Sequence, residues 1–564
     1  MLSVRLPLFG TALCSLLVAS PLLAIAEEEP VGIAAQEQTD EESGLVDFTI
    51  NGEYRLRSLQ IHPVELGGTS VRDISWTEQR ARIDAAATVP GVISITLQAD
   101  ALSGVLLGDN GRFLGDPSSS SGVSLATKTP NLTRWEIGLL PGGDPLNRED
   151  YGPVLTEADL LNINFLYADA NLPFGILRLG RQPLNYGATI TAHEGGRYNR
   201  WGVSQYADAA DRILFGTKID EIIKTLSDPD HVADASLERG VVLAMFYDFF
   251  RQNDIATTDD NLRQMGVNMQ WLVDEADWFG QNWRGLQISG TFTHLRNEQF
   301  GTRIYAFPLG IKTGINNVDF TFQFSHLRGE TSEIAEGFGA LQGRSARPQR
   351  LEAYGAHGLI DLHLGPVTLS MEANYASGDA SPRVTDPINT FSFARDFNVG
   401  LLLFEHILAF ESARSVAVGI ENLSDLDMES FPLTEIQTDG RFSNAIALFP
   451  QIHVKMLERP EHSLFARAGV LAAWSATSLG VVDAIQTALN DAGGPIEDNA
   501  INYHGGVPAR FYGTELDLQL GYKFRENFFW TVEAAVLFPG AALYNEHGLA
   551  TRSFLVENRF EILF

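Results

Sequence analysis

The chain has 564 residues and a formal net charge of −31, from 40 Lys plus Arg against 71 Asp plus Glu. That balance argues against a nucleic-acid partner, because nucleic-acid binding rewards clustered basic residues that displace counterions from phosphates. The only cysteine, Cys14, lies in an N-terminal apolar stretch. The rest of the chain therefore has no thiol for disulfides, thiolate metal sites or nucleophilic catalysis.

Residues 1–26 have the composition of a secretory signal peptide. Arg5 precedes the apolar stretch, and Ala24 and Ala26 supply the small residues that a signal peptidase recognises. The alternative is a retained helical anchor, but two prolines interrupt the stretch. We therefore expect cleavage after Ala26.

Residues 27–46 are acidic and poor in large apolar side chains, so they bury too little surface to offset the entropy of ordering. We predict a disordered periplasmic leader. After residue 26, no apolar run reaches the ~20 residues that a membrane-spanning helix needs. If the protein lies in a membrane, it must cross as strands.

From Asp47 onward the sequence changes to short segments in which apolar and charged side chains alternate. In the first of them Tyr54 and Leu56 fall on one face, whereas Arg55 and Arg57 fall on the other. Alternation of this kind, repeated over segments of about ten residues, is typical of strands that face lipid on one side and water on the other.

Further alternating segments follow along the whole chain. The second spans residues 78–89, and others begin near Leu161, Phe174, Arg212, Val241, Leu262, Leu286, Val318, Leu351, Val367, Arg395, Ala445, Leu464, Glu515, Phe528 and Arg552. They predict an all-β fold over residues 47–564, a transmembrane antiparallel β-barrel of about 18 strands, with 16 to 20 as the range.

The connections between these segments fall into two sizes. Short links lie at 89–92, 171–175, 364–366, 459–462 and 525–527. Long links rich in Gly, Ser and Asp lie at 103–158, 185–210, 329–349, 377–393 and 476–511. Outer-membrane barrels have short periplasmic turns and long extracellular loops, so the two sizes indicate that both ends of the barrel are periplasmic.

The last segment, residues 554–564, alternates and ends on an aromatic residue. Five apolar side chains share one face: Phe554, Val556, Phe560, Ile562 and Phe564. The pattern resembles the C-terminal recognition strand of bacterial outer-membrane proteins, although a buried edge strand of a soluble sandwich would look similar. The resemblance implies a barrel-closing strand, recognition by the barrel assembly machinery, and contact with outer-membrane lipid and lipopolysaccharide.

Patterns typical of catalysis are missing from the sequence. There is no GxSxG elbow and no HExxH pair, and the twelve histidines are scattered without metal-ligand spacing. We predict no enzymatic activity, no catalytic residue, no metal site and no cofactor.

Five arginines are concentrated in residues 177–215 of this otherwise acidic chain. They are Arg178, Arg181, Arg197, Arg200 and Arg212. If the glycine-rich loop between them folds into the lumen, their guanidinium groups would form a positive constriction suited to carboxylates or phosphates. The alternative is that they brace the barrel wall in ladders of Arg and Glu.

Three stretches resemble alginate-export-type outer-membrane barrels and related porins. They are GRQPLNYG at 180–187 with RYNRWG at 197–202, NYASGDASP at 374–382 with TFSF at 390–393, and GTELDLQLGYKF at 513–524 with FPG at 538–540. The resemblance implies an 18-stranded barrel whose arginine-lined pore passes an anionic polysaccharide. The sequence departs from that pattern because strand parity puts Glu53, Glu78, Asp84 and Glu352 on the same side as the arginines.

We therefore expect a passive outer-membrane channel for solutes or an anionic polysaccharide. The first alternative is a closed barrel whose long loops at 103–158 and 476–511 mediate adhesion or partner docking. A barrel hydrolase is the second alternative, but no cluster of serine, histidine and acid can be assembled at one rim.

Overall fold

The computed structural model describes residues 46–564 except for 68–72, 109–158, 185–189, 194, 196–198, 205–207, 229–230, 232–238, 251–261, 333–347, 380–386, 422–437, 439 and 491–498. The predicted signal peptide, and the predicted leader up to residue 45, lie outside the described residues.

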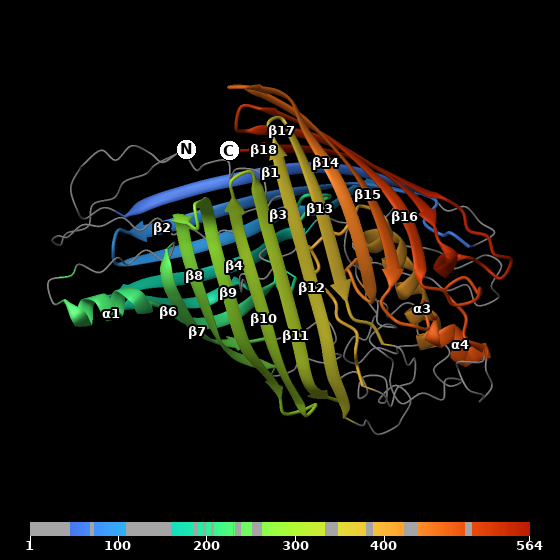
Figure 1. The fold of residues 1–564 in the computed structure, drawn as a ribbon, viewed down its shortest axis with the longest axis horizontal. Helices are drawn as coiled ribbons and strands as arrows, with labels where there is room; N and C mark the ends of the chain where they lie inside the picture. Colours follow the sequence, from blue (N-terminus) through green and yellow to red (C-terminus); the bar gives the residue numbers. More distant parts are fainter. Residues whose placement is uncertain are drawn as a thin grey trace.

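One sheet of 18 strands makes up the fold (Figure 1). Its strands are β1 (Asp47–His62), β2 (Ile74–Val89), β3 (Ile93–Gly108), β4 (Asp159–Leu172), β5 (Gly175–Pro183), β6 (Ala209–Lys218), β7 (Gly240–Phe249), β8 (Arg263–Trp278), β9 (Gln281–Asn297), β10 (Thr302–Ile315), β11 (Val318–Thr331), β12 (Gln349–Leu364), β13 (Val367–Ala376), β14 (Ala445–Arg459), β15 (His462–Ser475), β16 (Phe511–Phe524), β17 (Phe528–Pro539) and β18 (Ser553–Leu563). Each strand pairs antiparallel with its neighbours in the sequence, and β18 pairs with β1. The predicted closed antiparallel barrel is confirmed.

The described helices are few and short. They are α1 (Ile219–Ser227), the π-helix η1 (Leu403–Leu408), α3 (Ala409–Glu421), α4 (Ala484–Asn490) and the 3-10 turn η3 (Ala541–Leu543). None of these helices is long and apolar enough to cross a membrane.

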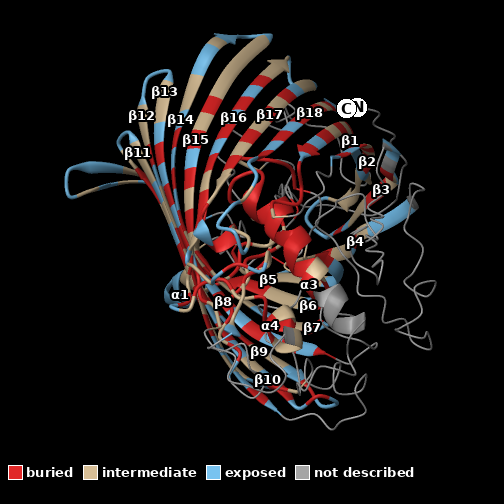
Figure 2. Cartoon of the chain, turned by 90° about the vertical axis from the view of Figure 1, so that its right-hand side faces the viewer, coloured by how far each residue is buried: buried red, intermediate tan, exposed pale blue. Residues whose placement is uncertain are grey.

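The two faces of the wall differ in polarity because side chains alternate along each strand. On β8 the outward Met265 and Met269 are 48% and 55% exposed, whereas the inward Gln264 and Gln270 are 5% and 3% exposed. The stripes of burial in Figure 2 follow this alternation along the strands. Exposed apolar side chains form the outer surface, which is the surface that a lipid bilayer needs.

The seam between β1 and β18 is held by backbone bonds up to the end of the chain. The Gly52 N–H donates to the Phe564 carbonyl at 2.7 Å, and the Phe564 N–H donates to the Gly52 carbonyl at 3.0 Å. On β18, Phe554, Val556 and Ile562 are 45–52% exposed. With Phe560 and Phe564, they lie on the outer, lipid-facing side of the closing strand.

The two ends of the barrel have connections of different length. Links of two or three residues lie at 90–92, 173–174, 279–280, 316–317, 365–366, 460–461 and 525–527. At the opposite end the chain leaves the wall for residues 184–208, 377–444 and 476–510. One connection at the short end, residues 219–239, is longer and contains α1. At the end with the long connections, the link between β9 and β10, residues 298–301, is short. The predicted asymmetry of the turns is present with these two exceptions.

One predicted strand, beginning near Arg395, is wrong. Residues 399–410 are buried throughout and run through η1 into α3, inside the barrel (Figure 2). A segment that is buried on all sides and mostly apolar suits the inside of the barrel better than a wall with two unlike faces. The predicted strand starts also omit β3 and β10, and in β10 Pro308 interrupts the pattern.

Candidate functional site: a constriction across the lumen

The connection between β5 and β6 crosses the inside of the barrel. At one wall the Ile190 N–H donates to Gln323 of β11 at 3.0 Å, and at the other wall Arg82 of β2 donates to the Gly195 carbonyl at 3.3 Å. In a closed sheet of 18 strands, β2 and β11 are nine strands apart and lie opposite each other. The described residues between 190 and 204, which we call the crossing segment, therefore divide the lumen.

Arginines of the wall bind the backbone of the crossing segment. Arg55 and Arg80 each donate to the Ser204 carbonyl at 3.1 Å, and Arg559 donates to the Gly202 carbonyl at 3.0 Å. Bonds between charged donors and buried carbonyls are among the stronger hydrogen bonds in proteins. These wall arginines fix the position of the segment, and the sequence pattern did not point to this role.

The wall arginines are also balanced by wall carboxylates. Arg80 pairs with Glu53 at 2.8 Å, and Arg82 binds both oxygens of Asp100 at 2.7 and 2.8 Å. Glu78 pairs with Arg57 at 3.3 Å, and Asp84, on the same strand parity as Arg82, accepts from Gln98 at 2.7 Å. The mixed-sign lumen that strand parity predicts for Glu53, Glu78 and Asp84 is therefore present. Glu352 is the exception, because it is exposed on the outer face and accepts a bond from the Tyr354 hydroxyl at 2.7 Å.

Three of the five arginines predicted at the constriction face inward, each with a carboxylate. Arg178 binds both oxygens of Asp169 at 2.6 and 2.9 Å, Arg212 binds both oxygens of Asp248 at 2.6 and 2.7 Å, and Arg200 binds Asp361 at 3.0 Å. Burial, and then the charge of Arg467, lower the pKa of Arg200. These arginines are braced by the wall rather than presented as a ring of uncompensated charge.

Of the other two arginines the structure describes only Arg181, and it is not at this position. Arg181 shares the outer face of β5 with Leu179, which is 43% exposed, and pairs with Asp211 at 3.2 Å near the rim. Closeness in sequence groups Arg181 with the others, but its strand parity turns it away from the lumen. Arg197 lies outside the described residues.

A second inner segment, residues 396–415, fills one side of the lumen, and we call it the plug. Leu401, Leu402, Leu403 and Ile407 are at most 1% exposed, and they belong to the same apolar cluster as wall residues of β1, β2, β14, β15, β17 and β18. Those wall residues include Leu59, Ile61, Trp76, Phe449, Leu471, Leu537 and Leu555. The plug is therefore held mainly by buried apolar area.

A carboxylate of the wall caps the start of the plug's helical turns. Glu515 of β16 accepts from the N–H groups of Leu401 and Leu402 at 2.8 Å and from that of Leu403 at 2.7 Å. The first N–H groups of a helix have no partner within it, and a negative charge there also favours the helix dipole. The sequence pattern predicts a strand that begins near Glu515, but it does not predict that this side chain caps a helix.

Two titratable groups of the plug are held neutral by burial. Burial raises the pKa of Glu405 to about 8, although Arg57 lies 3.7 Å away, because Arg57 is closer to Glu557 at 2.8 Å. Burial also lowers the pKa of His406 to about 3. Glu405 and His406 therefore add little charge to the lumen near neutral pH.

The plug and the crossing segment are joined to each other. The Asn398 amide donates to the Trp201 carbonyl at 3.1 Å, and the Ser204 hydroxyl donates to Asp396 at 2.9 Å. Trp201 is 1% exposed, stacks on Phe449 with ring centroids 5.7 Å apart, and donates to Gln451 at 3.1 Å. The two segments thus form one constriction.

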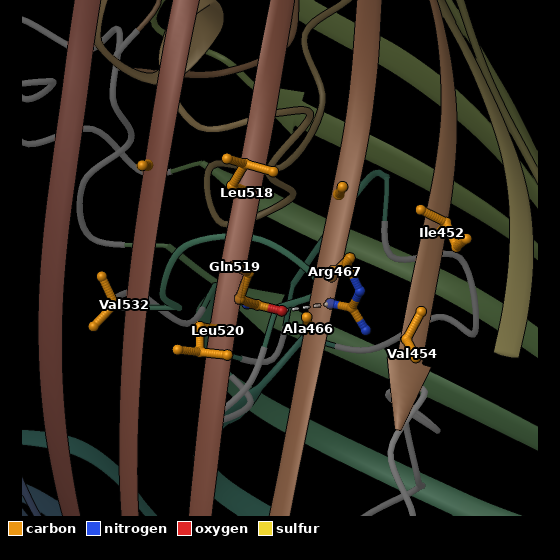
Figure 3. Close-up of a pocket in the computed structure, with 10 residues that line it drawn as sticks. Ile452, Val454, Ala466, Arg467, Leu518, Gln519, Leu520 and Val532 are labelled. Carbon is orange, nitrogen blue, oxygen red and sulfur yellow. Dashed lines mark hydrogen bonds between the residues drawn. The ribbon is translucent and has the colours of Figure 1, made fainter. Parts of the chain in front are cut away.

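The outer side of the same wall carries a shallow apolar groove over β14 to β17. Ile452, Val454, Leu518 and Leu520 line it (Figure 3). On these strands Arg467 donates to Gln519 at 3.2 Å, and both side chains belong to the inner face near the crossing segment. The groove is part of the lipid-facing surface and is separate from the constriction.

Comparisons of the sequence with known proteins give no relative. No protein-family model matches the chain, and no curated protein matches it.

Solved structures show a distant likeness over most of the chain. The outer membrane protein OpdK from Pseudomonas aeruginosa is 10% identical with a TM-score of 0.42, covering 92% of this chain and 99% of its own. OccK9 (OpdG) from the same organism is 10% identical with a TM-score of 0.44, covering 91% and 98%. OccAB1 from Acinetobacter baumannii is 8% identical with a TM-score of 0.43, covering 91% and 96%. Likeness at this level carries no argument about function.

Proposed function

We propose that the protein is a passive, non-enzymatic channel for small hydrophilic solutes in the outer membrane of a Gram-negative bacterium. The observation that carries the proposal is the crossing segment, which runs from β2 to β11 inside a barrel with an apolar outer wall. A barrel of this size is too wide for wall side chains to fill, so inner segments decide what passes.

The charges around the constriction support a filter by size more than by sign. Arg178, Arg200 and Arg212 are each paired with an aspartate. Opposite charges in contact present a weak net field to a passing ion. We therefore expect modest ion selectivity in the native channel.

Single-channel recording in planar bilayers tests this proposal. We expect stepwise conductance from the purified protein, and a larger conductance when residues 199–204 are replaced by a glycine and serine linker of the same length. A matched linker over the external turn at 298–301, outside the lumen, should leave the conductance unchanged. A native protein without conductance steps would contradict the proposal.

A narrower form of the proposal is transport of an anionic polysaccharide, supported by the resemblance of residues 180–187 and 374–382 to alginate-export-type barrels. The paired arginines weigh against it, because a polyanion needs uncompensated positive charge. Block of the current by oligouronates, without block by neutral oligosaccharides of equal length, would support the narrower form.

A second candidate is a closed scaffold, which the plug favours because it fills one side of the lumen with apolar side chains. In that case long external loops, including residues 476–510, would bind a partner. A scaffold would show no conductance and would lose partner binding when those loops are shortened, whereas a channel would keep its conductance.

A further inference from the structure

Charged side chains cross the outer surface of five neighbouring strands, β8 to β12, at the end of the barrel with the long loops. Strand pairing puts them in one line, with Arg263 opposite Arg296, Arg296 opposite Arg303, Arg303 opposite Glu330, and Glu330 opposite Arg350. All five side chains are exposed. We call this line the upper row.

Two further rows lie beneath the upper row on the same outer face. The middle row consists of Met265, His294, Tyr305, Arg328 and Glu352, and the lower row of Val267, Phe292, Phe307, His326 and Tyr354. From the upper row to the lower row, charged side chains are thus replaced by mainly aromatic and aliphatic ones over four residues of each strand, or roughly 13 Å. The surface is amphiphilic and faces the membrane.

The upper row brings like charges together. Arg263, Arg296 and Arg303 are directly opposite one another, and like charges in that position destabilise a sheet. Arg296 pairs with Glu298 at 2.8 Å, but both side chains are more than half exposed, so the pair contributes little. Within the described residues, no ion pair joins Arg263 or Arg303 to an acid. An external anion would remove this repulsion.

The middle row adds an unpaired polar atom. The Nε2 atom of His294 is buried and has no hydrogen-bond partner among the described residues. The ring stacks on Tyr305, with centroids 4.6 Å apart and planes 8° apart, and His326 stacks on Tyr354 in the same way at 4.5 Å. Because this Nε2 atom is buried, it is not open to a ligand from outside; the stacked rings beneath the arginines instead offer an apolar surface to acyl chains.

We infer that this face binds a phosphorylated lipid of the outer leaflet. Its phosphates contact the arginines of the upper and middle rows, and its acyl chains lie over Val267, Phe292 and Phe307. Arginine recognises phosphate through paired N–H groups. The aromatic row below the arginines selects an amphiphile over a soluble anion, since a free phosphate gains nothing from it. The inference rests on the proposed function only for the location in an outer membrane.

Native mass spectrometry of the full-length protein in a neutral detergent tests the inference. We expect bound diphosphoryl lipid A, weaker binding of its dephosphorylated form, and no competition from inorganic phosphate. The variant Arg263→Gln, Arg296→Gln, Arg303→Gln should bind diphosphoryl lipid A about tenfold more weakly. Arg459→Gln with Arg525→Gln, which removes charge at the other rim, should bind it as the native protein does.

A thermal measurement separates binding from folding. Without lipid, the triple variant should unfold at the same or a higher temperature than the native protein, because like charges have been removed; with lipid A, only the native protein should gain stability. Equal binding by the native protein and the triple variant, equal binding of both forms of lipid A, or competition by inorganic phosphate would each overturn the inference. Conductance recorded on the same samples tests the channel separately.

Discussion

The crossing segment and the plug lie side by side in the same lumen, but they are held by different forces. The crossing segment is bound mostly through its backbone, by guanidinium groups of β1, β2 and β18. The plug is bound mostly through apolar side chains that the wall buries. Directional bonds can be lost one at a time, whereas an apolar interface is lost as a unit. The comparison predicts that the two segments can be loosened independently.

Glu515→Leu should have the largest effect. Three buried N–H groups of the plug would lose their acceptor, at a cost of about 1–3 kcal/mol each. We expect hydrogen exchange of residues 401–408 to accelerate by about 100-fold or more, while the barrel stays folded. Glu533→Leu is the matched control, because Glu533 accepts from Gly202 of the crossing segment at 3.0 Å. Equal acceleration of the plug by both variants would contradict independent anchoring.

Trp201→Ala should loosen the crossing segment in preference to the plug. The change removes a fully buried ring and its bond to Gln451, which costs about 3 kcal/mol. We expect noisier open-channel current and faster exchange of residues 199–204. Phe410→Ala, which truncates a buried ring of the plug, is the comparison and should accelerate exchange within 401–413. The same exchange pattern for both variants would show that the two segments unfold as one.

Asp361→Asn should change ion selectivity, and it should also weaken the anchoring of the crossing segment, because it removes the charged partner of a largely buried arginine. Arg200 would keep its charge and lose its charged partner, so the constriction would become more positive. We expect the reversal potential in a salt gradient to shift toward anions by about 10 mV. Asp211→Asn, which alters the outward pair with Arg181, should leave the reversal potential unchanged.

Glu405→Gln should have the smallest effect, and it should depend on pH. Because the pKa of Glu405 is raised to about 8 in the folded protein, the folded state holds its proton over a range in which an unfolded chain releases it. The stability of the native plug should therefore fall as pH rises from about 4.5 to about 8 and then level off. In the variant this slope should be smaller, as measured by exchange of residues 403–408 between pH 5 and pH 9. A slope that the variant leaves intact would assign the effect to other groups.

The wall could be predicted from the sequence because lipid and water impose a period of two on every strand. The orientation of β1 follows from its alternation alone, because Tyr54 and Leu56 face outward whereas Arg55 and Arg57 face the lumen. The same rule fails at residues 399–410. A segment that is buried on all sides has no water-facing side, so its sequence carries no alternation from which a strand or a helix can be predicted.

The constriction was harder to predict than the wall. From the sequence, entry of the loop at 185–210 into the lumen is only a condition, and the partners of that loop cannot be identified. Arg55 and Ser204 are 149 residues apart, and Arg559 and Gly202 are 357 apart. In addition, the acceptors are backbone carbonyls, which carry no sequence signal. Strand parity alone would have placed Arg181 correctly, and closeness in sequence misplaced it.

The topology also orders the events of folding. All wall pairings except β18 with β1 join neighbours in the chain, so the wall can form hairpin by hairpin in chain order. Gly202, by contrast, finds its partners 331 and 357 residues away, on β17 and β18. The anchoring of the constriction is therefore complete only once the last hairpins have formed, so the protein acquires its full filter after its shell.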